Sequence, residues 1–435
     1  MTGKGWKMDN QYDVLVLGGG IAGQEAALNL AKLGYQVLMV EKDLSIGGKM
    51  IHLSKVFPTL DCGACITTPK VSETARHPNI KIYTASGMQE IFRKDDRFFQ
   101  GDLVVKPRFV DEEKCTGCEA CEEVCPVVVR DQYQWDLVGR KAAYLPFSIA
   151  SPRIAAIDID HCTLCGACER ACPADAIDFT QKEEKIPVSF KSMIIASGFE
   201  LFDPTQMERY GYGRYPNVIT SMQMERQLVP TRPYNNVLRP GDGKMPDNIA
   251  YLLCIGSRDE TVNNPICSRV CCMYSIKQAQ LVMGALPMAD VTIYYIDMRC
   301  YGKGFEEFYE QTKEMGVEFV KGKVAKIDQK ENGDLILRYE DIAADQIKEA
   351  EHDMVVLSVG ILPNPDHGTL FKDVPLELDE LGYVRQVDKI VNPVKTNLEG
   401  VFAAGTALEP MDIPDAIATA GAAAAESARY LKRMQ

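Results

Sequence analysis

The alternation of apolar and polar positions predicts an α/β chain of buried parallel strands and amphipathic helices. Residues 12–17, YDVLVL, form a short apolar run typical of a buried parallel strand, and the helical pattern QEAALNLAKLG follows at 24–34. A second strand, YQVLMVEK, occupies 35–42. A similar apolar strand recurs at 248–255, NIAYLLCI, before the helical segment MYSIKQAQLV at 273–282. The pattern therefore predicts two strand–turn–helix units.

The turn after the first strand, Gly18-Gly19-Gly20-Ile21-Ala22-Gly23, is the fingerprint of a dinucleotide-binding fold. In such a turn Gly18 allows the tight bend, Gly20 lets the backbone approach a pyrophosphate, and Gly23 allows close helix–strand packing. Glu41 ends the second strand, where it would accept hydrogen bonds from the adenosine ribose. Gly48 lies in a further turn common in flavoproteins with two dinucleotide-binding domains. The sequence therefore predicts an FAD site here.

Later segments complete this pattern. The strand KSMIIASG ends at Gly198, and TNLEGVFAAGTA contains a strand that ends before Gly405. Thr406 stands where flavoproteins of this type usually have an acidic residue, so no ribitol contact is assigned to it. An Ala-rich helix starts at Ile413, and its free N–H groups would stabilise negative charge on a reduced flavin. The alternative is a well-packed C-terminal helix with no role at the flavin.

Two runs of four cysteines share the spacing C-x2-C-x2-C-x3-C-P, the signature of a bacterial ferredoxin with two [4Fe–4S] clusters. In such ferredoxins the fourth cysteine of each run ligates the other cluster. One cluster is therefore assigned to Cys115, Cys118, Cys121 and Cys172, and the other to Cys162, Cys165, Cys168 and Cys125. A pair of zinc sites is the alternative, but zinc sites rarely use such a run.

A further group of cysteines, Cys254, Cys267, Cys271 and Cys272, occupies the second strand–turn–helix unit. The usual nicotinamide-binding turn is missing there, because Gly256 is followed by the bulky side chains of Ser257, Arg258 and Asp259. We expect a degenerate second dinucleotide domain in which a third [4Fe–4S] cluster replaces the nicotinamide site. Buried or redox-active thiols are the alternative.

Cys62 and Cys65 form a C-x-x-C motif after the glycine turn, at a position loosely like the redox disulfide of glutathione-reductase-type enzymes. A disulfide there could accept reducing equivalents from the flavin. The motif can equally form a structural turn, or half of a site that a partner chain completes.

Composition narrows the function further. Asp and Glu number 61 against 48 Lys and Arg, a net charge of −13, which argues against a nucleic-acid binder. No apolar run approaches the roughly 20 residues that a membrane-spanning helix needs. Fifteen cysteines in so long a chain predict metal or redox sites rather than structural disulfides.

The chain resembles the A-type flavin subunits of heterodisulfide reductase. The resemblance is carried by GGKMIHLSKVFPTLDCGACITTPK, YGYGRYPNVITSMQMER, CIGSRDE, CSRVCCMYSIKQA, DMRCYGKGFEEFYE and PDAIATAGAAAA. It implies a thioredoxin-reductase-like core with FAD, a cluster on the Cys254 group, and Lys277 near the isoalloxazine, where a cation tunes the flavin. By sequence alone, Lys277 is more simply a surface lysine of a helix. The resemblance also implies a cytoplasmic, hetero-oligomeric complex with B- and C-like or other iron–sulfur subunits, and a dimeric form is one option.

Long members of that family carry further domains at both ends, whereas this chain has about eleven residues before its first predicted strand. It is expected to be a compact form, similar in outline to the flavin subunit of quinone-interacting membrane-bound oxidoreductase complexes. Electron bifurcation or confurcation at the flavin would then need another subunit to supply one electron path.

The expected fold class is α/β: a two-dinucleotide-binding flavoprotein of the thioredoxin- and glutathione-reductase type with an inserted two-cluster ferredoxin. We expect an FAD domain at 10–108, 183–246 and 363–435, interrupted by the ferredoxin at 109–182 and the degenerate nicotinamide-type domain at 247–362. The expected function is electron transfer between FAD, clusters and partner subunits. The rivals are an NAD(P)H-dependent disulfide reductase using Cys62 and Cys65, and a scaffold whose clusters only stabilise an assembly.

Overall fold

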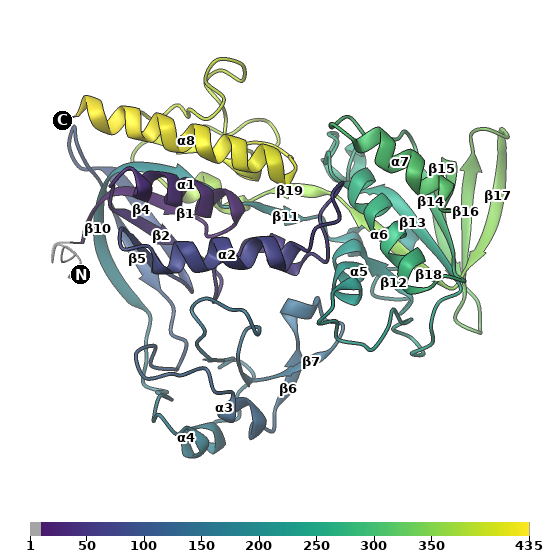
Figure 1. Cartoon of the computed structure of the whole chain (residues 1–435), viewed down its shortest axis with the longest axis horizontal. Coiled ribbons are helices and arrows are strands. Elements are labelled where there is room, and N and C mark those ends of the chain that lie inside the picture. Colours follow the sequence, from purple (N-terminus) through teal and green to yellow (C-terminus); the bar gives the residue numbers. More distant parts are fainter. Residues whose placement is uncertain (1–9, 435) are drawn as a thin grey trace.

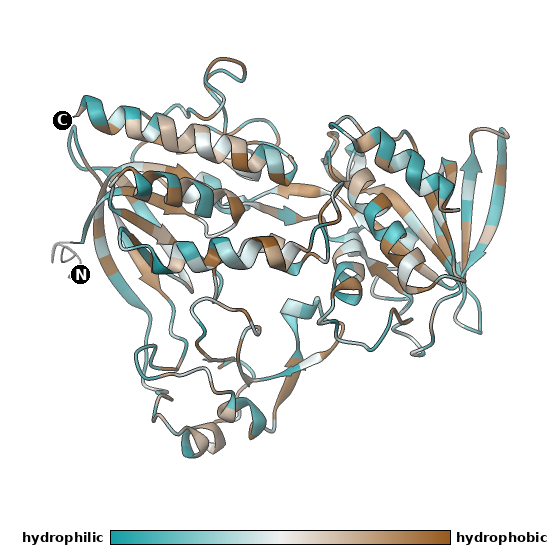
Figure 2. Ribbon diagram, viewed as in Figure 1, coloured by the Kyte–Doolittle hydropathy of each residue, from teal (hydrophilic) through white to brown (hydrophobic). Residues whose placement is uncertain are grey.

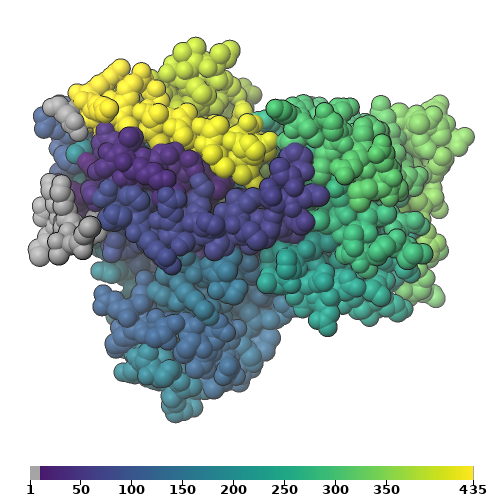
Figure 3. Space-filling model, in the orientation of Figure 1, coloured from purple at the N-terminus to yellow at the C-terminus, as the bar shows by residue number. Residues whose placement is uncertain are grey.

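The computed structural model describes residues 10–434, which form two α/β lobes and an insert that projects from the first lobe (Figures 1 and 3). The first and the last described elements share the first lobe, and the second lobe is built from the middle of the chain. The insert lies between two neighbouring strands of the first lobe's sheet.

The first lobe is built on a seven-stranded sheet. Its strands are β1 (Gln11–Leu17), β2 (Val37–Val40), β3 (Ile80–Tyr83), β4 (Ser86–Arg93), β5 (Phe99–Val105), β10 (Glu184–Ile195) and β20 (Val401–Ala403). Their order is β3-β2-β1-β10-β5-β4, and β20 also pairs with β10. Because β1, β10 and β20 run parallel, their carboxyl ends meet at one edge of the sheet.

Three long helices pack in this lobe: α1 (Ile21–Lys32), α2 (Gly63–Arg76) and α8 (Ile413–Arg433). Helix α1 lies between the other two (Figure 1). Ala26 and Ala27 of α1 and Ala420 and Ala423 of α8 are fully buried. Such small side chains let the two helices approach closely, which explains the alanine-rich sequence of α8.

The insert has little regular structure. Its elements are α3 (Ala120–Glu123), α4 (Ala167–Ala171), and the antiparallel pairs β6 (Val128–Arg130) with β7 (Gly139–Lys141) and β8 (Ala143–Tyr144) with β9 (Ala156–Ile157). Its small core includes the side chains of Cys121, Cys125 and Cys168. So small a core needs further cross-links to be stable, and bound clusters could supply them.

The second lobe is built on another seven-stranded sheet, ordered β12-β18-β13-β14-β15-β16-β17. These strands are β12 (Val218–Thr220), β13 (Asn248–Ile255), β14 (Asp290–Tyr295), β15 (Glu318–Gln329), β16 (Leu335–Asp341), β17 (Gln346–His352) and β18 (Met354–Val359). Its helices are α5 (Ser221–Leu228), α6 (Cys271–Ala285) and α7 (Phe305–Glu314). The central strands are apolar and α7 is largely polar (Figure 2), as expected of a sheet covered by helices.

Two short antiparallel strands, β11 (Phe199–Leu201) and β19 (Ile361–Pro363), connect the lobes where the chain leaves and returns. The short 3-10 helices are η1 (Gly48–His52), η2 (Gln132–Gln134), η3 (Pro204–Gln206), η4 (Glu208–Tyr210), η5 (Glu260–Val262), η6 (Pro365–Thr369) and η7 (Gly405–Ala407).

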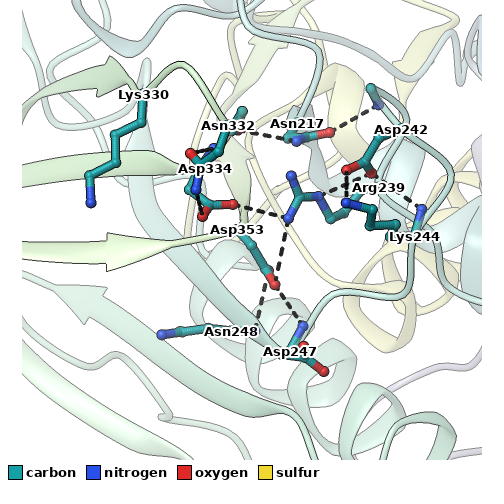
Figure 4. A network of polar contacts seen from close by, with 12 residues as sticks. Asn217, Arg239, Asp242, Lys244, Asp247, Asn248, Lys330, Asn332, Asp334 and Asp353 are labelled. Carbon is teal, nitrogen blue, oxygen red and sulfur yellow. Dashed lines mark hydrogen bonds and ion pairs between the residues drawn. The ribbon is translucent and has the colours of Figure 1, made fainter.

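A buried arginine links three turns of the second lobe. The Arg239 side chain, 8% exposed, pairs with Asp334 at 3.0 Å and Asp242 at 3.2 Å, and lies 3.9 Å from Asp353 (Figure 4). These carboxylates belong to three separate turns. One side chain therefore anchors the segment before β13 to the β15–β16 and β17–β18 turns.

Candidate functional site

The glycine turn after β1 has room for no side chain at two positions. A Cβ at Gly18, whose φ is +107°, would lie 2.3 Å from the carbonyl oxygen of Ala196. A Cβ at Gly23 would lie 1.9 Å from the carbonyl oxygen of Gly18. These glycines therefore bring the first turn of α1 directly against the end of β1, as the fingerprint predicts.

The neighbouring glycines leave open backbone. Gly20 begins α1 without a side-chain cap, and a Cβ there would meet Gly48 Cα only at 3.8 Å. A Cβ at Gly48, by contrast, would lie 2.8 Å from Gly20 Cα. The two glycine backbones thus pack closely at the start of α1, and no side chain caps its first N–H groups, which fits a pyrophosphate.

Glu41 lies beside this turn and is 6% exposed. Its carboxylate accepts hydrogen bonds from the backbone N–H groups of Gly19 at 2.6 Å and Asp43 at 3.0 Å. Burial, reinforced by the charge of Asp43, raises the pKa of Glu41 to about 7. The hydroxyl groups of a ribose would donate hydrogen bonds to the carboxylate and stabilise its charged form. The site therefore fits the adenosine part of FAD.

The other predicted flavin residues lie at the carboxyl ends of β10 and β20. A Cβ at Gly198, φ +74°, would meet no atom within 4 Å, whereas one at Gly405 would lie 2.9 Å from Ala22 Cβ in α1. Helix α8 begins at Ile413, and the Asp412 carboxylate caps it by accepting the Asp415 N–H at 3.0 Å. The sheet therefore brings these residues and the α1 turn to one edge.

The two cysteine runs of the insert adopt the same backbone conformation. Gly117 and Leu164 occupy equivalent positions in the runs, with φ of +64° and +53°. Their N–H groups donate to the sulfurs of Cys115 and Cys162, in each case at 3.4 Å. Backbone donors of this kind stabilise negative charge on a thiolate, whether or not the residue is glycine.

Cys125 of the first run lies with the second run. It lines a recess of about 310 Å³, counting its open mouth, together with Cys162, Cys165 and Cys168. The Ala143 N–H donates to Cys125 Sγ at 3.5 Å. Four thiols around one recess are the donor set that a cuboidal cluster needs, and they come from both runs.

The remaining four thiols of the insert are less enclosed as a set. Cys121 is buried, and burial first, with the nearby Cys115 second, raises the pKa of its thiol to about 11. Cys172 Sγ accepts the Ala176 N–H at 3.3 Å, and Cys118 is exposed. Cys115 and Cys172 both pack against the core that contains Cys121.

In the second lobe, the Cys271 thiol hydrogen-bonds both the Cys254 thiol and the Cys272 thiol. A hydrogen bond with Cys271 is the main cause that lowers the pKa of Cys254 to about 7. Cys267 Sγ accepts the Arg269 N–H at 3.3 Å. Cys300, which the sequence left unassigned, lies near Cys272; burial first, and then the charge of Cys272, raises the pKa of Cys300 to about 12.

Within residues 10–434, no three His, Cys, Asp or Glu side chains converge closely enough to hold a single metal ion.

Lys277 is a buried residue of α6, 1% exposed, and not a surface lysine. Its ammonium forms an ion pair with Glu225 of α5 and lies 3.4 Å from Ser54 Oγ. Glu225 also accepts the Ser54 N–H at 2.8 Å and an amide N–H of Gln278 at 2.6 Å. Because Ser54 follows η1, this pair joins the second lobe to the loop after Gly48.

Phe202 fills the place where a nicotinamide-binding turn would be open. Gly256 has φ of +69°, and a Cβ there would lie 2.0 Å from the Phe202 ring. Arg258 follows in the left-handed region at φ +55°. The phenyl ring thus packs on the one remaining glycine.

Cys62 caps the first turn of α2, and its Sγ accepts the Cys65 N–H at 3.2 Å. Cys65 is exposed, and a hydrogen bond with Cys62 is the main cause that raises the pKa of the Cys65 thiol. The two thiols are therefore adjacent, with Cys65 exposed and Cys62 half-buried.

Sequence reasoning assigned no role to Glu225, Arg226 and the segment Asp297–Cys300, although motifs of the resemblance contain them. The Arg226 guanidinium donates to the carbonyl oxygen of His52 at 3.2 Å and to Gln134 of the insert at 2.9 Å. Helix α5 thus touches both lobes and the insert. An adjacent Glu–Arg pair in a short helix that also contains two methionines and a leucine was the available signal, since such charges are buried only when paired.

Models of three protein families match the chain. The 4Fe-4S dicluster domain matches residues 111–176, FAD dependent oxidoreductase matches 13–67, and pyridine nucleotide-disulphide oxidoreductase matches 274–425. The predicted 4Fe-4S domain and FAD-type oxidoreductase are confirmed at this level. In the described residues, no helix is both long and apolar enough to cross a membrane.

Among curated relatives, the chain is 45% identical over 431 residues to the second iron–sulfur A-type polypeptide of the CoB–CoM heterodisulfide reductase of Methanopyrus kandleri, covering 98% of the chain and 65% of that protein. It is 42% identical over 419 residues to the A-type polypeptide of the H2:CoB–CoM heterodisulfide,ferredoxin reductase of Methanothermobacter marburgensis, covering 95% and 63%. The chain thus spans 63–65% of the length of these relatives.

Solved thioredoxin reductases share the fold. The Lactococcus lactis enzyme has a TM-score of 0.54 at 14% identity and covers 97% of this chain and 99% of its own. The T. acidophilum enzyme has a TM-score of 0.55 at 15% identity and covers 98% and 100%. The predicted two-dinucleotide-binding fold is confirmed.

Proposed function

We propose that the chain, which is 45% identical over 431 residues to an A-type polypeptide of heterodisulfide reductase, transfers electrons between a bound FAD and several [4Fe–4S] clusters. FAD supplies the exchange between paired and single electrons, and each cluster carries one electron. The protein's own part is to hold these groups at fixed spacing and to set their electrostatic surroundings.

The observation that carries the proposal is how the insert is attached to the flavin turn. The Ile46 N–H donates to the carbonyl oxygen of Ser151 at 3.0 Å, and the Ser151 N–H donates to Ser45 Oγ at 2.8 Å. Ser45 and Ile46 directly precede Gly47 and Gly48. A rigid attachment at this point would keep the insert's clusters at a constant distance from the flavin.

The proposal assigns FAD to the turn of Gly18, Gly20 and Gly23, with Glu41, Gly48, Gly198, Gly405 and the α8 start at Ile413. It assigns two clusters to the eight insert cysteines, with the fourth cysteine of each run bound to the other run's cluster. It assigns a third cluster to Cys254, Cys267, Cys271 and Cys272. It keeps the division into an FAD domain, the insert at 109–182 and the nicotinamide-type domain at 247–362. The filled turn at Gly256 supports a degenerate role for that last domain.

Partners are proposed from the relatives' printed names. Those names describe one lettered polypeptide of a heterodisulfide reductase, which implies others, so we propose a hetero-oligomer. From the resemblance of the sequence, we propose B- and C-like or other iron–sulfur subunits as its partners and the cytoplasm as its location. Two more specific functions are proposed as alternatives to each other. The flavin carries out electron bifurcation, or the chain is the flavin subunit of a quinone-linked complex. Co-purification of the native complex followed by mass spectrometry distinguishes them.

The first test is the content of iron, acid-labile sulfide and FAD in the anaerobically purified chain. We expect about twelve irons per FAD, since each cluster contains four. About eight would remove the third cluster from the proposal. Near zero, with labile sulfide also missing, would refute the electron-transfer role.

A disulfide reductase is the second candidate, favoured by the adjacent thiols of Cys62 and Cys65. As a disulfide they would accept two electrons and two protons to become two thiols. Electrons would have to reach the flavin from a donor other than a nicotinamide bound at Gly256. Thiol titration of the chain before and after reduction tests this role, with the Cys62→Ser variant as control.

A further inference from the structure

A frame of charged side chains surrounds the third cysteine group, Cys254, Cys267, Cys271 and Cys272. Asp297 follows β14, and its carboxylate forms an ion pair with Arg258 in the turn after β13. The same carboxylate lies 3.5 Å from Nε of Arg299. One carboxylate therefore holds two guanidinium groups, and the frame carries a net positive charge.

Both guanidinium groups face thiols of this group. The Arg258 side chain hydrogen-bonds Cys254, and the Arg299 side chain hydrogen-bonds Cys267. The backbone of the same segment contacts Cys272, whose Sγ lies 4.0 Å from the carbonyl oxygen of Asp297. The frame thus reaches three of the four cysteines directly.

The insert, which holds the other two groups of cysteines, carries an excess of negative charge instead. Residues 109–182 contain thirteen Asp and Glu against seven Lys and Arg. Two of those arginines are already paired with carboxylates: Arg153 with Glu119 at 2.6 Å, and Arg140 with Asp158 at 2.9 Å. The insert's thiols accept hydrogen bonds mainly from backbone N–H groups, such as that of Gly117.

An electron added to a cluster makes it more negative, so nearby positive charge favours reduction and nearby negative charge opposes it. We propose that Arg258 and Arg299, positioned by Asp297, raise the reduction potential of the third centre above the potentials of the two insert centres. Electrons would then run downhill from the insert through the flavin to the second lobe. This inference rests on the third cluster of the proposed function.

The test is an anaerobic redox titration of the full FAD- and cluster-loaded chain, followed by electron paramagnetic resonance. Arg299→Gln and Arg258→Gln should each lower the potential of one centre, and Asp297→Asn should raise the potential of that same centre. A tenfold change in the reduction equilibrium is expected for each, which corresponds to 59 mV for a one-electron centre. Opposite signs from neighbouring residues are not expected of a merely structural role.

Two variants control the experiment. Arg338→Gln removes an exposed charge on β16 of the same lobe and should move no centre. Arg299→Lys keeps the charge and should retain both iron and potential, even where Arg299→Gln loses iron. Twelve irons per FAD with unmoved potentials, or with all three substitutions shifting the same way, overturns this inference alone. About eight irons per FAD in the unsubstituted chain overturns the third cluster and the inference with it.

Discussion

Arg269 and Asp415 form an ion pair of 2.8 Å between the Cys267 loop of the second lobe and the first turn of α8 in the first lobe. The backbone N–H of the same arginine donates to Cys267 Sγ. One residue therefore contacts a proposed cluster ligand and the helix start proposed to face the flavin. This links the positions of the two sites across the lobe boundary.

We expect Arg269→Ala to loosen this contact without loss of iron, because the backbone donor to Cys267 remains. The ion pair is partly exposed, so its loss should cost no more than about 1 kcal/mol of stability. Hydrogen–deuterium exchange should rise in residues 410–415. Unchanged exchange there, with the arginine removed, would show that the pair does not hold the lobes together.

The buried pair Lys277–Glu225 should behave very differently. Removing one partner leaves an unpaired buried charge, so Lys277→Met or Glu225→Gln should each lower the free energy of unfolding by about 3–5 kcal/mol. The double variant Lys277→Met/Glu225→Gln should lose much less than the sum. Denaturant unfolding of the FAD-free chain measures all three.

The exposed pair Lys372–Glu90 is the control for that cycle. Lys372→Met should leave the unfolding midpoint unchanged, because water already solvates both charges. If the double Lys277/Glu225 variant is as unstable as the sum of the single variants, the two side chains do not act as a pair.

The sequence predicted the elements whose signal is local. The strand, glycine turn and helix at 12–34 appear as β1 and α1, and the helix proposed at Ile413 begins there in α8. Each of these predictions rests on the spacing of apolar residues, or on the residue types of a turn, within one segment. The shared spacing of the two cysteine runs belongs to the same class of signal.

What could not be predicted depends on contacts between distant segments. Lys277 has the sequence context of an exposed helical lysine, and only folding brings Glu225 and Ser54 around it. Asp297 is likewise an ordinary loop residue until the turn after β13 places Arg258 beside it. Charge pairing across more than 35 residues leaves no periodicity that a single sequence reveals.

Glu41 should make FAD binding depend on pH. Its pKa of about 7 in the FAD-free chain means that it is largely protonated at pH 6. A ribose that donates hydrogen bonds favours the ionised carboxylate, so FAD affinity should rise up to tenfold per pH unit toward about pH 7 and then level off. Calorimetry in buffers of different ionisation enthalpy should detect a proton released on binding.

The stability of the FAD-free chain should change in the opposite direction. The folded pKa lies above the unfolded value of 4.5, so between these values the folded chain binds the extra proton. Stability should therefore fall as pH rises through that window. Glu41→Gln should remove both pH dependences, and a variant that keeps either one would assign it to another group.

Cys125 should belong to the cluster of the second run, because it lines the recess of Cys162, Cys165 and Cys168. We expect Cys125→Ala and Cys165→Ala to abolish the same paramagnetic centre, and Cys172→Ala to abolish the other. The double variant Cys125→Ala/Cys165→Ala should lose no more iron than either single variant, because both residues serve one cluster. Cys300→Ala, outside the insert, is the control and should leave both insert centres intact. Loss of different centres in Cys125→Ala and Cys165→Ala would mean that each run binds its own cluster, against the geometry of the recess.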